Sequence, residues 1–362
     1  MKERNIPKYL QLKQEILSWI HSGRLKMNGQ IPTENELAQQ FEVSRHTVRQ
    51  TLGELEKEGW LYKVQGKGSF VSKREANKGK DINLIGILTT YISDYIFPHI
   101  VRGAEETLRT KGYRLLLSST DNHKEKEKEN LEMLMNQPLS GLIIEPTKSA
   151  QGNPNLEFYL SLENKNLPYL MINERYPELS CPCIKVDDEL GGFLAAEHLI
   201  KLGHKRIMGF FKTDDIQGVN RLKGFIRAHQ KDQVVMNPVN VITYATEEKN
   251  DKPLEKALEA IKRNEERPTA FVCYNDELAI KLLEVLRQEG LSIPSDLSMV
   301  SFDDSLLATA TEVKFTTLSH PKAEIGKKAA EVLLQMIENP SIRQNDFIFS
   351  PELIVRDSTR II

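Results

Sequence analysis

A short polar stretch near the start of the chain, RHTVRQ at residues 45–50, carries side chains suited to reading DNA. Arginine can donate two hydrogen bonds to a guanine edge, glutamine can pair with adenine, and threonine can meet a phosphate or a thymine methyl group. Val48, Leu52 and Leu55 recur at helical spacing, so the polar residues share the opposite face. The pattern predicts a helix that packs on a core and presents a basic face to the major groove.

The elements on either side would position this helix. PTENELAQQF carries a capping-box pattern, Thr33 followed by Glu36, which predicts a short helix before it, and Ser44 is suited to cap the polar helix itself. WLYKV and GSFVS read as two strands joined by QGKG, a glycine-tipped hairpin whose lysine could meet a phosphate. Any single basic residue is more often a solvated side chain than a DNA contact, but the ordered combination favours DNA binding.

Residues 6–72 resemble the winged helix-turn-helix domain of the GntR family of bacterial regulators, through matches such as Glu34, Leu37, Arg49, Gly59 and Val71. The resemblance implies that the third helix faces DNA, with residues 34 and 44 near phosphates and residues 65 and 66 at the wing. The candidate DNA-binding residues are Lys8, Glu34, Ser44, Arg45, His46, Thr47, Arg49, Gln65, Gly66 and Lys67.

Beyond this unit the composition and the periodicity change. Residues 73–81 are polar and charged, which predicts a linker, although an ordered connection is an alternative. From residue 82 onward apolar strand patterns alternate with helical patterns, which indicates parallel sheets covered on both faces. We therefore expect a winged helix-turn-helix domain (α+β) over 1–72, a linker over 73–81, and an α/β domain of two parallel-sheet lobes over 82–362.

Polar side chains follow many of these predicted strands, where ligands bind in open α/β sheets. Carboxylates, amides and a guanidinium group, with aromatic rings beside them, are what a polyhydroxylated ligand needs, because every buried hydroxyl group must find a partner. Each such residue taken alone is more often a turn former or a helix cap. Their recurrence at successive strand ends predicts a small sugar as the ligand.

Residues 82–362 resemble the effector domain of the LacI/GalR family, which is similar to periplasmic sugar-binding proteins, through phrases such as VDDELGGFLAAEHLIKLGHKRIMGF and AFVCYNDELAIKLLEVLRQEGLSIPSDLSMVSFDDS. Two segments depart from the family pattern, ISDYIFPH and INER. The candidate effector-binding residues are Tyr95, Phe97, His99, Arg175, Asp187, Asn220, Arg221, Asn275, Asp303, Ser319 and His320.

A GntR-type domain joined to a LacI-type domain is similar to the arabinose-utilisation repressors of Gram-positive bacteria. That resemblance implies L-arabinose as the effector. Our main hypothesis is a repressor that binds operator DNA as a homodimer and leaves the DNA when the sugar closes the cleft between the lobes. The residues themselves leave three alternatives open: another sugar as effector, a co-repressor that tightens DNA binding, and a sugar-processing enzyme. The enzyme is disfavoured because the chain has neither a phosphate-binding GxxxxGK[ST] loop nor a GxSxG nucleophile motif.

Composition limits the kinds of protein that this sequence can encode, through its charge, its cysteines and its lack of long apolar segments. The net charge is −2 over 362 residues, with 13 Lys and Arg against 9 Asp and Glu in residues 1–75, so the basic charge is concentrated at the amino-terminal end. The three cysteines predict neither a disulfide framework nor a metal site, and no cofactor is expected. The chain has no signal-peptide pattern and no long apolar run, so we expect a cytoplasmic protein without a membrane segment.

Overall fold

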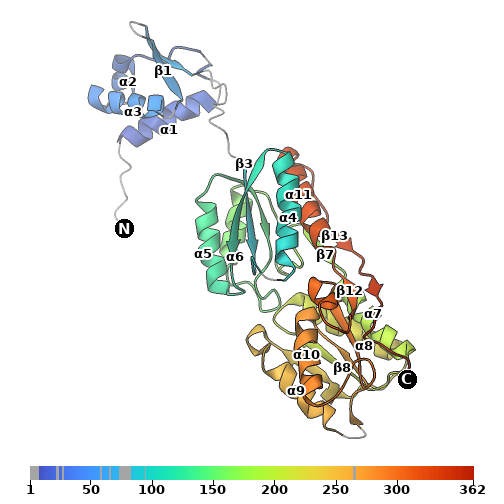
Figure 1. Cartoon of the computed structure of the whole chain (residues 1–362). Coiled ribbons are helices and arrows are strands. Elements are labelled where there is room, and N and C mark those ends of the chain that lie inside the picture. The colour runs from blue at the N-terminus through green and yellow to red at the C-terminus, as the bar shows by residue number, and fades with distance from the viewer. Residues whose placement is uncertain are drawn as a thin grey trace, which may run out of the picture. The chain divides into compact units, whose positions relative to one another are not determined.

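The computed structural model divides the chain into two units, Met1–Ile82 and Asn83–Ile362 (Figure 1). The predicted linker and the predicted wing residues Gln65 and Gly66 lie outside the residues that the structure describes. No helix among the described residues has the length and apolar character needed to cross a membrane. The described residues are 8–21, 24–26, 28–57, 59–64, 67–72, 83–93, 95–263 and 266–362.

The described residues of unit 1 form three helices and two antiparallel strands, in the predicted order. The capping box forms: the Thr33 side chain accepts a hydrogen bond from Glu36 N, and the Glu36 carboxylate accepts one from Thr33 N at 2.7 Å. Apolar faces of the three helices meet in one core that includes Leu12, Leu37 and Val48. The elements are α1 (Lys8–His21), α2 (Glu34–Gln40), α3 (Arg45–Lys57), β1 (Leu61–Val64) and β2 (Gly68–Val71).

The first lobe of unit 2 is a six-stranded parallel sheet with the strand order β13-β7-β6-β5-β3-β4. Helices cover both faces of this sheet, α4 and α11 on one face and α5 and α6 on the other (Figure 1). Its elements are β3 (Asn83–Thr89), α4 (Phe97–Thr110), β4 (Tyr113–Ser119), α5 (Lys124–Met135), β5 (Leu139–Ile144), α6 (Leu156–Asn164), β6 (Tyr169–Ile172), β7 (Cys183–Val186), α11 (Lys322–Glu338) and β13 (Phe347–Phe349).

The second lobe repeats this plan with the strand order β14-β12-β11-β10-β8-β9, in which only β14 runs antiparallel to its neighbour among the described strands. Helices α7 and α8 cover one face, and α9 and α10 cover the other. Its elements are α7 (Asp188–Lys201), β8 (Ile207–Lys212), α8 (Ile216–Lys231), β9 (Val241–Tyr244), α9 (Lys252–Ile261), β10 (Ala270–Val272), α10 (Asp276–Gln288), β11 (Ser298–Asp303), β12 (Thr316–Ser319) and β14 (Leu353–Ile354).

The chain passes between the lobes three times, from β7 to α7, from β12 to α11, and from β13 to β14. The lobes are therefore not two consecutive halves of the sequence, and α11 covers the first lobe although it follows a strand of the second. The crossings bring residues far apart in sequence to the boundary between the lobes. Three connections of this kind form a hinge about which two lobes can close on a ligand.

Close packing of α7 on α8 fixes one side of this boundary. A Cβ atom at Gly192 in α7 would collide with the carbonyl group of Arg221 in α8, and one at Gly224 would collide with the carbonyl group of Glu189. Glycine at both positions lets the helix backbones approach closely. The approach brings the Arg221 side chain to the start of α7.

Candidate functional site

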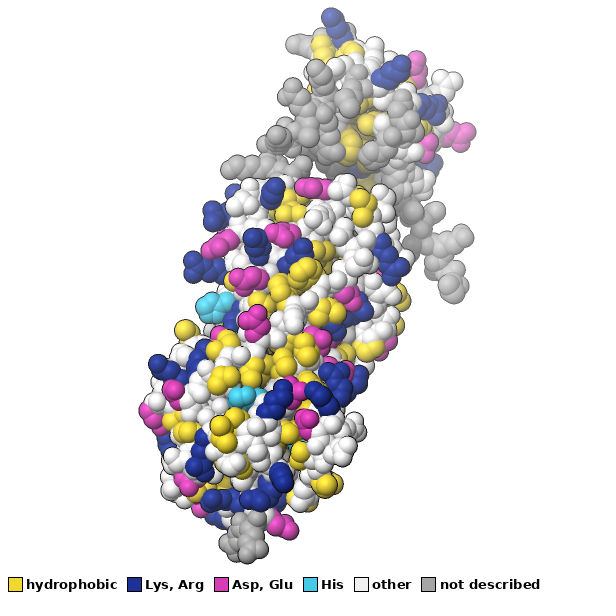
Figure 2. All heavy atoms as spheres, turned by 90° about the vertical axis from the view of Figure 1, so that its right-hand side faces the viewer, with side chains coloured by type: hydrophobic (Ala, Val, Ile, Leu, Met, Phe, Trp, Pro, Cys, Tyr) yellow, Lys and Arg dark blue, Asp and Glu magenta, His cyan; other side chains and the backbone are white. Residues whose placement is uncertain are grey.

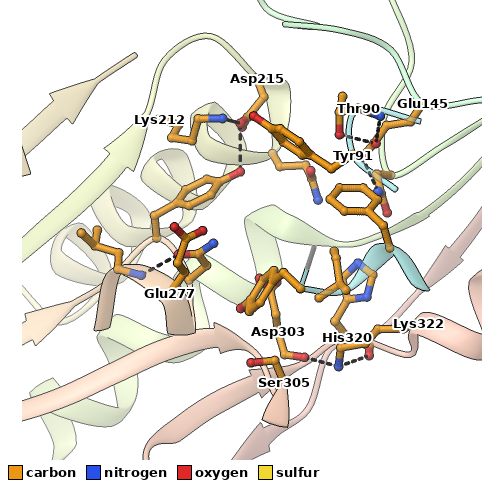
Figure 3. Close-up of a pocket in the computed structure, with 18 of the residues that line it drawn as sticks. Thr90, Tyr91, Glu145, Lys212, Asp215, Glu277, Asp303, Ser305, His320 and Lys322 are labelled. Carbon is orange, nitrogen blue, oxygen red and sulfur yellow. Dashed lines mark hydrogen bonds and ion pairs between the residues drawn. The ribbon is translucent and has the colours of Figure 1, made fainter. Parts of the chain in front are cut away.

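A cavity of about 970 Å³ lies between the lobes of unit 2 and is lined by residues of both (Figure 3). Its wall contains both aromatic rings and polar side chains. Asp and Glu residues are as numerous as Lys and Arg residues in the lining, seven of each. The balance of charge suits a neutral polar ligand, because an anionic ligand would be served by an excess of basic groups.

The first lobe contributes the residues that follow three neighbouring strands, Thr90 after β3, Glu145 after β5 and Asn173 after β6. The Glu145 side chain accepts hydrogen bonds from Thr90 N at 2.9 Å, Thr90 Oγ1 at 2.6 Å and Asn173 Nδ2 at 2.6 Å. Burial raises the pKa of Glu145, and the hydrogen bonds from Thr90 and Asn173 oppose that shift. Thr90, Glu145 and Asn173 thus form a hydrogen-bonded cluster around the Glu145 carboxylate at the carboxyl edge of the sheet.

In the second lobe, Arg221 is 3% exposed and lies between two carboxylates. Its Nε atom is 2.7 Å from Asp188 Oδ1, and its Nη2 atom is 3.4 Å from Asp303 Oδ1. Burial alone would lower the pKa of Arg221, but the two carboxylates raise it above its ordinary value. Burial raises the pKa of Asp188 to about 6, against the opposing effect of Arg221.

A second ion pair of this lobe lies across the cavity from Glu145 (Figure 3). Lys212 Nζ is 2.7 Å from Asp215 Oδ2, and the Tyr274 hydroxyl group donates to the same carboxylate oxygen at 2.9 Å. Burial would raise the pKa of Asp215, but the Lys212 charge holds it below its ordinary value. The Arg221 guanidinium group stacks 4.9 Å from the centre of the Tyr274 ring, so the aromatic wall is held in place by charged neighbours.

His320 lies at the second hinge crossing and lines the cavity. The side chain is 6% exposed, and neither ring nitrogen has a hydrogen-bond partner in the part of the chain that the structure describes. Burial lowers its pKa to about 4, so the ring is neutral at physiological pH. A buried, unpartnered imidazole in a cavity wall is suited to hydrogen-bond a ligand hydroxyl group.

Hydrogen bonds already join the two lobes around the cavity. The Tyr95 hydroxyl group of the first lobe accepts from Asp276 N at 3.1 Å and donates to Phe302 O at 3.4 Å. Asn122 Nδ2 donates to Thr246 Oγ1 at 2.9 Å across the same boundary. These contacts depend on the arrangement of the lobes, so a ligand that changes the arrangement changes them.

Seven of the eleven predicted effector-binding residues line the cavity: Tyr95, Phe97, His99, Arg221, Asn275, Asp303 and His320. Tyr95 is also engaged with the opposite lobe, as described above. Asn275 uses its side-chain oxygen to accept from Leu278 N at 2.9 Å, so it caps α10 as well as facing the cavity.

The other four predicted residues do not line this cavity. Arg175 points away, donating to Asp346 Oδ1 at 2.8 Å, and Asp187 caps α7 by accepting from Leu190 N at 2.9 Å. Asn220 donates to Glu174 Oε1 at 3.1 Å, and Ser319 accepts from Glu352 N at 2.9 Å.

Six further residues line the cavity although they were not among the predicted ones: Thr90, Glu145, Asn173, Lys212, Asp215 and Tyr274. Three of these residues, Thr90, Glu145 and Asn173, are recognisable in the sequence because each stands directly after an apolar strand pattern. The patterns are LIGILTT, GLIIEP and YLMIN. In this fold the first polar residue after a buried strand is therefore itself a candidate for contact with the ligand.

In unit 1 the polar face of α3 is open to solvent, with Arg45, His46 and Arg49 exposed. Ser44 Oγ accepts from Thr47 N at 3.1 Å and so caps the helix, while Glu34 Oε2 accepts from Arg49 Nε at 2.7 Å. The two remaining predicted residues that are described, Lys8 and Lys67, are exposed.

Comparisons with known proteins agree with both units. Residues 8–71 match the family model described as bacterial regulatory proteins, gntR family, and residues 196–359 match the periplasmic binding protein-like domain. A transcription regulator, CcpA of Lactococcus lactis, has a similar fold, with a TM-score of 0.68 and 22% identity over 77% of this chain and 99% of that one. A LacI family transcriptional regulator of Enterococcus faecium, solved with bound ribose, gives a TM-score of 0.65 and 24% identity over the same shares.

These features define a transcription regulator that joins a GntR-type DNA-binding unit to a LacI-type α/β unit. The chain is 67% identical, over 100% of both chains, to the arabinose metabolism transcriptional repressor of Geobacillus stearothermophilus. It is 47% identical to the repressor of the same name of Halalkalibacterium halodurans, over 97% of this chain and 96% of that one. The chain belongs to the family of arabinose metabolism transcriptional repressors, which confirms the predicted family and fold class. The relatives are transcription regulators, and the prediction that the chain is not an enzyme agrees with them.

Proposed function

We propose that this protein represses arabinose-utilisation genes by binding operator DNA through unit 1, and that L-arabinose bound in the cavity of unit 2 releases the DNA. The observation that carries the proposal is the chemistry of the cavity. It balances acidic and basic side chains, adds aromatic rings, and leaves buried polar atoms of Asn173 and His320 without partners among the described residues. A neutral molecule with several hydroxyl groups satisfies such atoms. The names of the two close relatives favour arabinose among the sugars.

The proposed mechanism is a shift between two arrangements of the lobes. A ligand that binds both arrangements equally shifts nothing, so L-arabinose must bind the DNA-releasing arrangement more tightly. Converting a population from 1:99 to 99:1 requires a preference of about 10⁴-fold, roughly 5.5 kcal/mol. This preference must come from contacts that the sugar makes in only one arrangement, whereas contacts between the lobes, such as Tyr95 with Asp276, contribute to the balance of the two arrangements without sugar.

We also propose that the protein acts as a homodimer in the cytoplasm. A dimer places two recognition helices on two half-sites of a roughly palindromic operator. Unit 2 exposes large apolar side chains, among them Phe347 and Ile348, and Figure 2 shows apolar side chains gathered along one of its faces. Apolar surface of this kind is typical of a contact with a second protein surface. Sedimentation equilibrium of the full chain should give twice the monomer mass of 41.4 kDa, and a monomer at micromolar concentration would contradict the dimer.

Calorimetric titration tests the choice of effector. L-arabinose, D-xylose, D-ribose and D-galactose are titrated separately into the full chain. We expect saturable binding of L-arabinose and at least tenfold weaker binding of the other three. Absence of heat with all four sugars, checked by the absence of any shift in the thermal unfolding midpoint, would overturn the proposal.

A further inference from the structure

The hydrogen bonds of Glu145 fix the orientation of a neighbouring side chain, Asn173, as well as its own. Glu145 is 6% exposed, and the three hydrogen bonds that it accepts use both carboxylate oxygens: Oε2 accepts from Thr90 N and Thr90 Oγ1, and Oε1 accepts from Asn173 Nδ2. A carboxylate is an acceptor only, so the group opposite Oε1 must be a donor. The NH₂ group of Asn173 is therefore the end of its amide that faces Glu145.

This orientation determines what Asn173 offers on its other side. The side chain is 2% exposed and lines the cavity, and its Oδ1 atom is buried without a hydrogen-bond partner among the described residues. The backbone at Asn173 has a φ of 64°, a left-handed conformation that asparagine tolerates better than most residues. An acceptor atom is thus held at the cavity wall and needs a donor from the ligand.

We infer that Glu145 is a positioning residue: it fixes the amide of Asn173 so that the effector site presents an acceptor and selects a ligand hydroxyl group that donates. The inference rests on the proposed function, because it concerns the cavity in which the sugar is proposed to bind. It predicts that the site presents a hydrogen-bond acceptor, not a donor, at Asn173. The alternative is that Glu145 only ties together the ends of β3, β5 and β6.

Exchanging donor and acceptor between residues 145 and 173 distinguishes a positioning role of Glu145 from a purely structural one. In Glu145→Gln the oxygen of the new amide at residue 145 accepts from Thr90, which leaves the NH₂ group of that amide facing Asn173. Asn173 must then turn its side-chain oxygen toward residue 145. The NH₂ group of Asn173 consequently points to the cavity, where the native protein presents an acceptor. In the double variant Glu145→Gln with Asn173→Asp, the amide at 145 donates to the new carboxylate. The second oxygen of that carboxylate then restores an acceptor at the cavity wall, with the total charge of the native pair.

The experiment is calorimetric titration of L-arabinose into the full-length wild-type protein, E145Q, N173D and the double variant. We expect E145Q to bind about tenfold or more weakly, which is the loss of roughly one hydrogen bond. N173D should also bind weakly, since two carboxylates then face each other. The double variant should recover an affinity within about threefold of the wild type. Thermal unfolding and operator binding are measured on all four proteins.

Glu127→Gln is the matched control. Glu127 is a fully buried glutamate of the same lobe that accepts from Tyr159, Tyr176 and Thr147 N, and it does not line the cavity. E127Q should retain the wild-type affinity for L-arabinose, which shows that loss of a buried carboxylate does not by itself weaken sugar binding.

The outcomes distinguish this inference from the proposed function. If the wild type binds none of the sugars, the proposed effector is wrong. If the wild type binds L-arabinose but E145Q binds equally well, or the double variant is as weak as the single variants combined, the positioning role is wrong and the effector proposal stands. If E145Q does not fold, the double variant is compared with the wild type alone, and weak binding by a folded double variant overturns the inference.

Discussion

Arg221 and Asp188 form an ion pair, 2.7 Å from Nε to Oδ1, in which both side chains are almost completely buried. Asp188 is the first residue of α7, where the chain has just crossed from the first lobe to the second. The pair therefore joins the hinge to the wall of the cavity. Asp303 lies on the other side of the same guanidinium group, so a ligand that contacts Asp303 acts close to the hinge.

Removing Arg221 is expected to affect stability as well as binding. Arg221→Ala leaves Asp188 buried without its partner, and breaking a buried ion pair costs about 3–5 kcal/mol. The unfolding free energy from urea titration should fall by that amount, and sugar binding should be lost. An unchanged urea midpoint would show that the ion pair does not contribute this amount to the stability of the fold.

Asp303→Asn tests binding with less damage to the fold. The substitution keeps the shape of the side chain, and the contact that it weakens, 3.4 Å from Arg221, is the longer of the two. We expect L-arabinose affinity to fall at least tenfold, about 1.4 kcal/mol or more, because a charged acceptor in the cavity is lost. Operator affinity without sugar should stay at the wild-type level. Calorimetry and fluorescence anisotropy check the two parts, and normal sugar affinity would remove Asp303 from the site.

The Tyr95 hydroxyl group is expected to favour the arrangement of the lobes in which it contacts Asp276 N. Tyr95→Phe removes two hydrogen bonds between the lobes and leaves Asp276 N without its partner. We expect sugar affinity to change by about three- to tenfold, since a hydrogen bond contributes roughly 1 kcal/mol. Tyr113→Phe, at the far end of β4, serves as the control and should leave the affinity unchanged. Equal affinities in both variants would contradict a role for Tyr95 in lobe closure.

Arg45 is expected to read the operator because it is exposed at the first position of α3. Arg45→Ala should weaken specific operator binding by about 1–3 kcal/mol and leave sugar binding intact. Lys57→Ala, an exposed basic residue at the opposite end of α3, is the matched control and should have a small effect. Anisotropy titrations with an operator duplex and a scrambled duplex distinguish specific from general binding. An equal loss in both variants would argue against direct base contact by Arg45.

The buried ring of His320 predicts a pH dependence of stability. The pKa is about 4 in the folded protein, against an ordinary value of 6.5, so the unfolded chain binds more protons between these values. Stability contributed by the neutral ring is present above pH 6.5 and is lost as the pH falls toward 4. Asp188 and Asp276, whose pKa values are raised to about 6, act in the opposite direction, so the His320 effect must be measured as a difference between two proteins.

His320→Gln provides that difference, because both aspartates are common to the two proteins. When the pH is lowered from 7.5 to 5, the wild type should lose up to about 2 kcal/mol of unfolding free energy that the variant does not lose. The difference in unfolding free energy between variant and wild type should therefore change by that amount in favour of the variant. Urea unfolding at the two pH values measures it. A difference between variant and wild type that is the same at both pH values would show that the ring is not held neutral.

Local patterns predicted most of the fold, since the capping box, the recognition helix and the strands of both lobes follow from side-chain spacing within each segment. The membership of α11 in the first lobe did not follow, because a helical period does not tell which sheet a helix covers. The same limit applies to the site. Arg175 was predicted from the LacI/GalR resemblance, although its segment INER departs from the family pattern. In the structure Asn173 of that segment lines the cavity, and Arg175 donates to Asp346.

The most direct test of the account is release of operator DNA by L-arabinose, followed by anisotropy with the wild type and Asp303→Asn. The account predicts that L-arabinose dissociates the wild-type complex over the same concentration range in which calorimetry shows binding. It also predicts that the D303N complex persists at that concentration. Sugar binding without loss of DNA from the wild type, or a tighter DNA complex when sugar is bound, would contradict it.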